Sequence, residues 1–551
     1  MIIAINFFTI LLMVFVIYKA IDKTPKDTKN NEEVKHKWAI FIFIFIFILL
    51  LGACVRLIEL DKLPAGFNQD EASIAYDAYS LLENGYDRNG YVYPVYPVAW
   101  GGGHGPFYLY FSMIFMKLLG PTVFAFRLGN AILSVIALAC AYFMLSKMFK
   151  TKYALIGMFV LAISPWNIML SRWGLDANPL PSLFLIATTL LIYAIDKKST
   201  WLYALSAGMY SISLYAYASA YIIVPLFLLF SIVYLLVKKK ITIKQVIISG
   251  IVFVLIAIPL GTFWIINFLD LEEITTKYFS IPKLSTLRSE SAFNFSRGGI
   301  NVWFESVIDY LDLVILLKAD DVMSNSIYEY GIYYMFAMIL SVIGIVITTI
   351  KCKNKEFNYE YIVMCIFVAA TIFTLMIGVN INRIHIIYIP ILFFILKAIE
   401  WIGERSSKLL TVVIVMFIIT FSCFIGYYTI VFNKNVGEYY FESFEDAVLY
   451  EKEKGGDKTT FVTPKVNGNY MLVMFYTKYD AKEYMNTVKF YDIDYEFDIA
   501  ESFGNYKFYL PKEIDYTANY IVHNSELDRF DKSKFDIMTF KYYSAVISKA
   551  E

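Results

Sequence analysis

Two adjacent carboxylates, Asp70 and Glu71, stand just beyond a long apolar run of this sequence. A positioned carboxylate can take the proton of an attacking hydroxyl, so the pair is a candidate for general-base chemistry. Asn68 and Glu71 have the spacing of a capping box, and Asn84-Gly85 is a helix stop. We therefore expect both acids in the first turn of a helix, where adjacent side chains diverge by about 100° and so do different jobs. The alternative is a pair of ordinary acids that the helix dipole favours.

Further polar residues stand at the ends of other apolar runs. The segment "SRWGLDANP" carries Arg172 and Asp176, and "NINRIHIIY" carries Arg383, His385 and Tyr388. Arginine can donate in a fork to phosphate oxygens, although an arginine at the end of a span can also reach lipid headgroups. If these ends share one face of a membrane, the residues form a site for an anionic, lipid-linked substrate.

The glycine-rich segment "WGGGHGP" at 100–106 lacks the Lys-Ser/Thr pair of a phosphate loop and therefore does not predict a nucleotide site. We expect its glycines to let the backbone pass close to another segment, with His104 as a polar contact or a structural residue. The five cysteines are scattered, and no pair has the spacing of metal ligands. A divalent metal near this loop is left open, with His104 and Glu83 as the residues to consider.

Composition indicates which elements would bring these residues together. Of the 551 residues, 58% are hydrophobic and 17% are charged, and the mean hydropathy is +0.57. These values are typical of a polytopic membrane protein, and a net charge of zero gives no indication of nucleic-acid binding. Apolar runs near the span length of about 20 residues predict about twelve transmembrane helices. They lie at 1–18, 38–58, 121–146, 153–170, 179–195, 201–218, 219–237, 245–269, 332–350, 361–379, 384–403 and 409–432.

Basic residues concentrate in one set of connections, at 19–37, 147–152, 197–198, 238–240, 351–355 and 405–408. Because lysine and arginine favour the cytoplasmic side, the other side receives the loops 59–120 and 270–331 and the tail. This arrangement requires the short apolar stretch 107–119 to lie along the membrane surface or to re-enter it. It predicts a multi-pass protein of the plasma membrane whose site and tail are extracytoplasmic.

The predicted fold class is an all-α polytopic membrane domain over 1–432, with surface helices in the first outer loop, followed by a small α/β or β-rich domain over 433–551. In this tail, "TTFVTPKV", "YMLVMFYT" and "ANYIVHNS" have the composition of strands. The tail carries no catalytic motif, so a lid or a docking module is expected.

The order of several segments resembles a known family. A first span ending in Arg56 is followed by "LP…DEA", "NGYDRNGYVYPVY" and "GPFYLYFSMIFMKLLGPTVFAFRL". This order is similar to the integral-membrane GT-C glycosyltransferases, in particular glycosyltransferase family 39, the dolichyl-phosphate-mannose–protein mannosyltransferase and aminoarabinose transferase type. The resemblance is strongest over 50–195 and continues through about 405; the tail resembles no family that we can name.

The resemblance implies an inverting transferase that moves a sugar from a polyprenyl-phosphate donor to a hydroxyl of a protein, lipid or envelope glycan. The family's acid pair falls on Asp70, as catalytic base, and Glu71. Its later acid falls on Asp176, and the basic residue for the donor phosphate falls on Arg383, although the spacing in "NINRIH" departs from the family's pattern. The other candidates for donor or substrate binding are Arg172, His385, His104 and Tyr388.

Two other functions fit a chain with many spans. A transporter or flippase would be expected to carry ionisable groups near the middle of the membrane or broken helices in related halves, whereas the charges here cluster at span ends. An oligosaccharide ligase or polymerase would share the lipid-linked donor, and the charged loop 270–331 would suit it.

Overall fold

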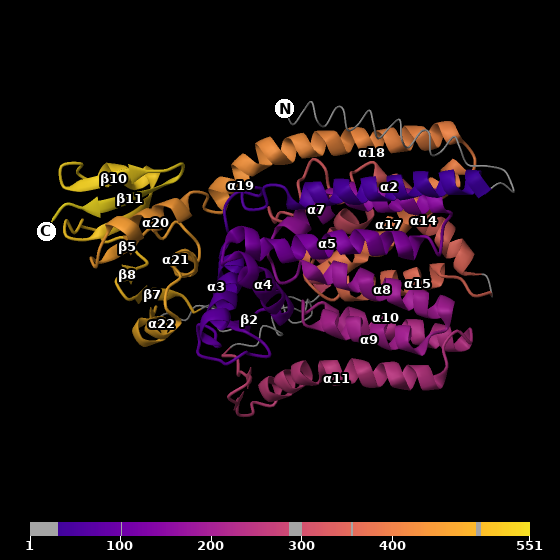
Figure 1. The fold of residues 1–551 in the computed structure, drawn as a ribbon, viewed down its shortest axis with the longest axis horizontal. Helices are drawn as coiled ribbons and strands as arrows, with labels where there is room; N and C mark the ends of the chain where they lie inside the picture. The colour runs from indigo at the N-terminus through magenta and orange to yellow at the C-terminus, as the bar shows by residue number, and fades with distance from the viewer. Residues whose placement is uncertain (1–30, 101, 286–299, 354–355, 492–497, 551) are drawn as a thin grey trace.

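The chain forms a bundle of long helices with a mixed α/β domain at one end (Figure 1). The computed structural model describes residues 31–100, 102–285, 300–353, 356–491 and 498–550. The expected first span, 1–18, lies outside these ranges. Seven helices in the described ranges are long and apolar enough to cross a membrane: α2 (Asn31–Leu57), α5 (Val123–Leu145), α8 (Pro179–Lys197), α10 (Ala220–Val237), α11 (Ile243–Phe268), α16 to α17 (Ile381–Gly403) and α18 to α19 (Ser407–Tyr439).

An eighth span is broken. The helices α6 (Thr151–Ile163) and α7 (Pro165–Arg172) pass the same test only together and meet at an angle of 54°. Arg56 of α2 fills the break, because its guanidinium donates to Ala162 O (2.9 Å) and to the Asn167 side chain (2.5 Å). These contacts satisfy a carbonyl that the end of α6 leaves without a helical partner.

Over the described ranges the structure thus has seven or eight candidate spans, fewer than the eleven apolar runs that the sequence offered there. The helices α9 (Thr200–Leu214), α14 (Ala337–Cys352) and α15 (Glu360–Thr374) have only 15 or 16 residues, whereas a span needs about 20. The runs 332–350 and 361–379 included apolar residues at 332–336 and 375–379 that form turns rather than helix. These short helices pack within the bundle, α9 against α8 and α11, and α14 against α17.

The basic connections lie together at one end of the bundle. Lys147 pairs with Asp196 (2.8 Å) and Lys150 with Glu404 (3.0 Å), which joins the segment after α5 to the last turn of α8 and to the residue after α17. The first outer loop and the C-terminal domain lie at the opposite end (Figure 1). For these connections, the grouping inferred from lysine and arginine is present in the fold.

The helix α3 (Gln69–Asn84) begins and ends where the sequence indicated. The Asn68 side chain accepts the backbone N–H of Glu71 (2.9 Å), and Gly85 ends the helix with φ of +77°. However, α3 is not a surface helix, because nearly all of its side chains from Glu71 to Leu81 are buried. It packs against α4 (Pro106–Leu119) on the membrane side and against the C-terminal domain on the other.

The helix α4 has 14 residues and is too short to span, as expected for the stretch 107–119. Its last turns expose Ile114, Leu118 and Leu119 by 53%, 75% and 52%. Apolar side chains exposed in this way at the end of a membrane bundle are typical of contact with the lipid interface.

The C-terminal domain contains one seven-stranded mixed sheet in the order β10-β11-β9-β5-β8-β7-β6, in which β5 runs parallel to β8 and β9. Its strands are β5 (Thr460–Val462), β6 (Lys489–Phe490), β7 (Ala500–Phe503), β8 (Tyr506–Lys507), β9 (Asn519–His523), β10 (Phe535–Thr539) and β11 (Tyr543–Ser548). Its helices are α20 (Phe444–Lys454), α21 (Asn469–Thr477) and α22 (Ala481–Thr487).

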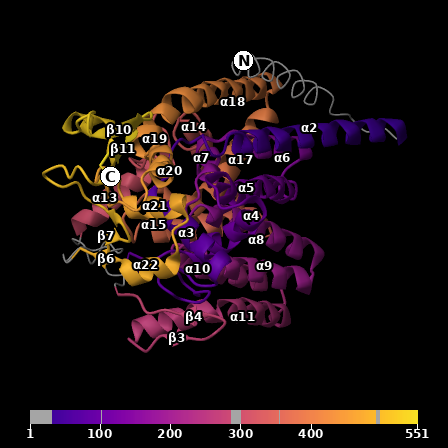
Figure 2. The same cartoon turned by 60° about the vertical axis from the view of Figure 1, so that its left-hand side comes forward.

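Two of the three predicted strands are confirmed, as β5 and β9. The third, "YMLVMFYT", is the helix α21, in which every residue is buried. A short apolar run that is buried on all sides does not distinguish helix from strand by its pattern. In Figure 2, α21 lies beside α3, so this domain packs directly on the first outer loop.

Smaller elements complete the outer end. They are the hairpins β1–β2 (Val98–Ala99, Gly102–Gly103) and β3–β4 (Ile274–Thr275, Ser280–Ile281), the helix α13 (Ile300–Tyr310) and the π-helix η1 (Leu311–Ile315). The last span passes without interruption from α18 (Ser407–Tyr427) through the π-helix η3 (Tyr428–Phe432) into α19 (Asn433–Tyr439). The expected domain boundary at 432 and 433 therefore falls inside a continuous helix.

Candidate active site

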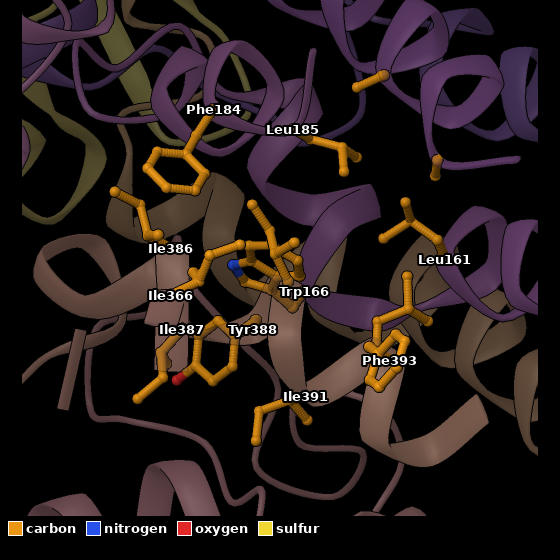
Figure 3. Close-up of a cluster of buried hydrophobic side chains, with 14 of the residues drawn as sticks. Leu161, Trp166, Phe184, Leu185, Ile366, Ile386, Ile387, Tyr388, Ile391 and Phe393 are labelled. Atoms are coloured by element: carbon orange, nitrogen blue, oxygen red, sulfur yellow. The ribbon is translucent and has the colours of Figure 1, made fainter. Parts of the chain in front are cut away.

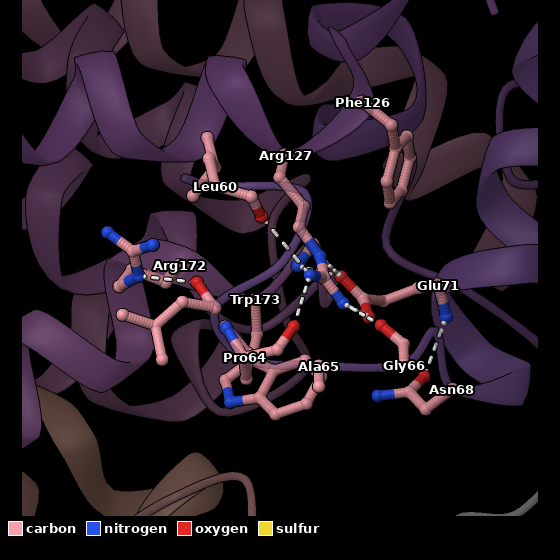
Figure 4. Close-up of polar contacts among 12 residues, drawn as sticks. Leu60, Pro64, Ala65, Gly66, Asn68, Glu71, Phe126, Arg127, Arg172 and Trp173 are labelled. Carbon is pink, nitrogen blue, oxygen red and sulfur yellow. Dashed lines mark hydrogen bonds and ion pairs between the residues drawn. The ribbon is translucent and has the colours of Figure 1, made fainter. Parts of the chain in front are cut away.

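The two adjacent acids have different surroundings, as their helical geometry predicts. Glu71 is fully buried and pairs with Arg127 of α5, whose Nε and Nη2 donate to its two oxygens at 2.8 and 2.7 Å (Figure 4). The backbone N–H of Gly174 donates to the same carboxylate (2.7 Å). Asp70, one residue earlier, is only partly buried.

Arg127 ties the first outer loop to α5. Beyond Glu71, it donates to the carbonyl oxygens of Leu60, Pro64 and Gly66 at 3.2, 2.9 and 2.8 Å. A buried guanidinium whose donors all find acceptors fixes the backbone around it. The Glu71–Arg127 pair thereby orients the first turn of α3, which carries Asp70.

Arg172 is bound to backbone rather than facing an open site. It is 1% exposed and donates to four carbonyl oxygens near the end of α2 at 2.7–3.1 Å; these belong to Val55, Ile58, Glu59 and Leu63. The guanidinium therefore closes the C-terminal end of α2, whose last carbonyls lack helical partners. The arrangement differs from the expected phosphate-binding role.

Three other expected residues meet around one tyrosine. Tyr217 lies between α9 and α10, and burial raises the pKa of its hydroxyl to about 12. Asp176 raises this pKa as well, and Asp70 does so more weakly, whereas Arg383 lowers it and hydrogen-bonds to the hydroxyl. Because the influence of one charge on another group falls with distance, Asp176 and Arg383 lie near this phenol, and Asp70 acts on it more weakly.

Asp176 is held by the glycine-rich segment. Its carboxylate accepts the backbone N–H of Gly105 (3.0 Å), and a side chain at Gly105 would overlap the carbonyl of Ala216, next to Tyr217. The expectation that these glycines allow a close backbone approach is therefore confirmed at Gly105.

The position of Arg383 is fixed by hydrogen bonds to residues that precede it in the chain. Its Nη1 donates to Gly378 O (2.9 Å), and its backbone N–H donates to the Asn380 side chain (2.9 Å), which caps α16. Asp320, from the outer loop 270–331, accepts the backbone N–H of Ile381 (2.8 Å). The outer loop thus takes part in positioning the guanidinium.

His385 and Tyr388 lie deeper than Arg383. The His385 ring is fully buried, 6.3 Å from the Tyr217 ring, and the Tyr388 ring packs 5.1 Å from Trp166 among isoleucine side chains (Figure 3). Among the described residues, neither ring nitrogen of His385 nor the Tyr388 hydroxyl has a hydrogen-bond partner. Buried polar atoms of this kind are unusual in a folded protein.

His104 belongs to a buried polar network beneath α3. Its Nε2 lies 3.2 Å from Ser73 Oγ, which accepts from Arg88 (2.7 Å), and Arg88 lies 3.4 Å from Asp77. Glu83 is exposed in the last turn of α3. Within the described ranges, no three His, Cys, Asp or Glu side chains are arranged to hold a metal, so the donor set does not fit one and no step is assigned to it.

Sequence reasoning missed Arg127 and Tyr217. Arg127 stands in the "RL" that formed part of the family resemblance, but a single arginine inside an apolar run gave no indication of its partner. Tyr217 was hidden because the predicted spans 201–218 and 219–237 left no connection between them. The tyrosine-rich "LYAYASAY" at this point was the available signal.

Residues 103–264 match the family model described as dolichyl-phosphate-mannose-protein mannosyltransferase. Among solved structures, the chain is similar to ArnT from Cupriavidus metallidurans bound to undecaprenyl phosphate, with 12% identity and a TM-score of 0.55 over 92% of this chain and 97% of ArnT. The apo state of ArnT gives 11% identity and a TM-score of 0.54 over the same shares. None of the curated proteins matches the chain in sequence.

The chain also has a weaker similarity to the archaeal oligosaccharyltransferase AglB from Archaeoglobus fulgidus. The identity is 11% and the TM-score 0.49, over 80% of this chain and 64% of that one. The chain thus spans less than two thirds of the length of AglB.

The match over 103–264 covers His104, Asp176 and Tyr217, and the likeness to ArnT covers most of the chain including the C-terminal domain. At 12% identity this likeness shows the fold alone. Family match and fold agree with the resemblance drawn from the first outer loop: over residues 103–264 this chain is similar to the dolichyl-phosphate-mannose-protein mannosyltransferase family, and its fold is similar to that of ArnT.

Proposed function

We propose that this protein transfers a sugar from a polyprenyl-phosphate donor to a hydroxyl acceptor, with inversion, at the extracytoplasmic face of the plasma membrane. The observation that carries the proposal is the approach of Asp176 to Tyr217, through Gly105 and the carbonyl of Ala216, on a site where the charges of Arg383 and, more weakly, Asp70 also act on the Tyr217 hydroxyl. A proton acceptor and a phosphate-binding cation are thereby available in one site. The ArnT structure contains undecaprenyl phosphate, which supports a donor of this class.

Asp70 is the proposed general base. It takes the proton of the acceptor hydroxyl as the oxygen attacks the anomeric carbon, and the sugar–phosphate bond breaks on the opposite side. A single displacement of this kind inverts the configuration and forms no covalent intermediate with the enzyme. Glu71 is committed to Arg127 and Gly174, so we assign it the positioning of Asp70 and not the proton transfer.

Arg383 is the proposed partner of the donor phosphate. The leaving group is an acidic phosphate, which needs charge stabilisation rather than protonation. The contacts with Gly378 and Tyr217 engage two of the N–H groups of the guanidinium, and the others can donate to phosphate oxygens. The His385 imidazole, beside Tyr217, is a second proposed donor, whereas the contacts of Arg172 favour a structural role.

The position of the site supports its extracytoplasmic assignment. The basic connections lie at the other end of the bundle, and basic loops mark the cytoplasmic side. On this basis Asp70, Arg383 and the C-terminal domain are outside, where a lipid-linked sugar is available but nucleotide sugars are not.

The test is transfer from a radiolabelled polyprenyl-monophosphate sugar by the purified protein in lipid vesicles, with an envelope extract as acceptor. Asp70→Asn should lower turnover by about 10²–10⁴-fold, the usual contribution of a general base. The matched control is Asp61→Asn, at an exposed position of the same loop, which should transfer at the normal rate. Transfer by Asp70→Asn at the normal rate, or movement of labelled lipid across the vesicle without any transfer, would refute the proposal.

A further inference from the structure

A cleft of about 600 Å³ lies between the membrane domain and the C-terminal domain, at the start of the helix that carries Asp70. It is lined by Gln69, the residue before Asp70, by several residues of α19, and by the loop after β5. The residues that matter here are Gln69, Asn435, Glu438, Tyr439, Lys465 and Asn467. The volume lies within the range of about 300–1,000 Å³ that is typical of small-ligand sites.

The wall formed by the C-terminal domain is in direct contact with the first turn of α3. A Cβ atom at Gly468 would lie 2.6 Å from the Gln69 Cβ, and Phe67 donates its N–H to the carbonyl of Tyr440 (2.9 Å). A side chain at Gly66 would overlap that same carbonyl. The residues just before the proposed base therefore pack directly on this wall.

This wall is also rigidly connected. The last span continues as helix through η3 and α19 to Tyr439, so only the four-residue turn 440–443 separates it from α20 of the C-terminal domain. Tyr76 of α3 donates to Tyr479 O (2.7 Å), and Arg88 donates to the Met471 sulfur (2.8 Å). A fixed wall is better suited to hold a ligand than a lid that must swing.

The chemistry of the lining favours a sugar. Gln69, Asn435 and Asn467 offer carboxamides, which both donate and accept hydrogen bonds, as sugar hydroxyls do. Tyr439 is 61% exposed and presents a broad apolar face with a polar tip. The charges of Glu438 and Lys465 balance, so the lining does not select for an anion.

A peptide fits these observations less well. A peptide that binds by adding a strand needs an exposed strand edge, whereas the lining residues come from the start of α3, from α19 and from loops. An anionic lipid headgroup would call for a cluster of basic side chains, and Lys465 is the only basic residue in the lining.

We propose that this cleft binds a saccharide, so that the hydroxyl deprotonated by Asp70 belongs to a glycan acceptor. The inference rests on the proposed function and adds the acceptor class and its binding site. The cleft orients one sugar of the acceptor, and Gln69 places its hydroxyl beside the base.

The experiment uses the full-length protein in lipid vesicles and a radiolabelled polyprenyl-monophosphate sugar. Two acceptor preparations are compared: envelope glycan freed of protein and lipid, and envelope protein freed of glycan. Label should enter the glycan. Tyr439→Ala and Asn467→Ala, both at exposed positions, should each raise the KM for the glycan by about tenfold, the equivalent of one lost contact, with a much smaller change in kcat.

The matched control is Tyr278→Ala, a tyrosine that is 69% exposed and does not line the cleft, and its KM should equal that of the wild type. Label in the protein fraction instead of the glycan, or an unchanged KM in both cleft variants, would overturn the saccharide assignment while leaving the proposed function intact. A wild-type protein that releases no sugar from the donor to either acceptor or to water would overturn the proposed function and this inference with it.

Discussion

Replacing Glu71 by glutamine separates the roles of the two adjacent acids. In the native structure one Glu71 oxygen accepts from Arg127 Nε (2.8 Å) and from Gly174 N (2.7 Å), and the other accepts from Arg127 Nη2 (2.7 Å). A glutamine has nearly the same shape but only one acceptor oxygen. Its amide nitrogen would face an N–H of Arg127 or of Gly174, and the guanidinium would lose its counter-charge.

The expected cost follows from the burial of the pair. Removing one partner of a buried ion pair costs about 3–5 kcal/mol, because the other charge remains buried. Arg127 keeps its three backbone acceptors, which partly stabilise the cation, so we expect about 3 kcal/mol. One kcal/mol shifts Tm by about 2–4 °C in a domain of 150–250 residues and by less in a larger one. A fall of several degrees is therefore expected.

The assay compares thermal unfolding and sugar transfer for the wild type, Glu71→Gln and Asp70→Asn in one detergent. Glu71→Gln should unfold at a lower temperature yet still transfer sugar well below that temperature, because Asp70 is intact. Asp70→Asn should unfold near the wild-type temperature without transferring. The reasoning is refuted if Glu71→Gln unfolds at the wild-type temperature but does not transfer sugar, because Glu71 would then act in the chemistry and not in positioning.

Two further outcomes are expected. Gly105→Ala should reduce transfer by at least about tenfold, the equivalent of about 1.4 kcal/mol, because the new methyl group would overlap the carbonyl of Ala216. The control is Gly250→Ala, whose new methyl group would meet nothing within 4 Å and which should transfer at the normal rate. Equal activity of the two variants would contradict the contact at Gly105. Burial and the neighbouring Asp77 raise the pKa of Asp87 to about 8. Between about pH 4 and pH 8 the folded state therefore keeps a proton that the unfolded chain releases, so the stability of the fold should decrease as the pH rises through this range. Asp87→Asn should remove this decrease in stability, so the Tm of the variant should exceed that of the wild type by an amount that grows from pH 5 to pH 8. Parallel Tm profiles of the two proteins would contradict the raised pKa of Asp87.

The features predicted from the sequence were those set by local physics. The ends of α3 follow from the Asn68 cap and the Gly85 stop, which act within a few residues. The grouping of the basic connections follows from a charge bias that acts on each loop separately. The divergence of Asp70 and Glu71 follows from helical geometry alone, although the identity of Glu71's partner does not.

The features that could not be predicted depend on packing between distant segments. The burial of α3 was missed because its polar residues, such as Ser73 and Asp77, resembled a solvent-facing side until the C-terminal domain covered them. The helix α21 was read as a strand because a fully buried run has no polar face to give a period. Arg172 was expected at a phosphate, but its side chain reaches the end of α2, more than a hundred positions earlier in the chain.

The contacts around Glu71 also explain how residues far apart in sequence can be held as one site. Glu71, next to the proposed base, accepts from Gly174, and Asp176 follows two residues later. Asp176 accepts from Gly105, whose backbone packs on the carbonyl that precedes Tyr217. Two of these steps are backbone hydrogen bonds to a buried or partly buried carboxylate and the third is a close backbone–backbone contact, so the path has little freedom to stretch.

This path ends near Arg383, whose charge acts on the Tyr217 hydroxyl, and it therefore joins the two ends of the proposed reaction. A site that holds base and phosphate-binding group at a fixed separation does not have to reorganise as the bond breaks. A change in the middle of the path should accordingly alter the separation and lower kcat more than it raises the KM for the donor. Gly105→Ala lies at that midpoint and touches neither Asp70 nor Arg383 in any described contact, so a larger effect on donor KM than on kcat would mean that the two ends are held independently.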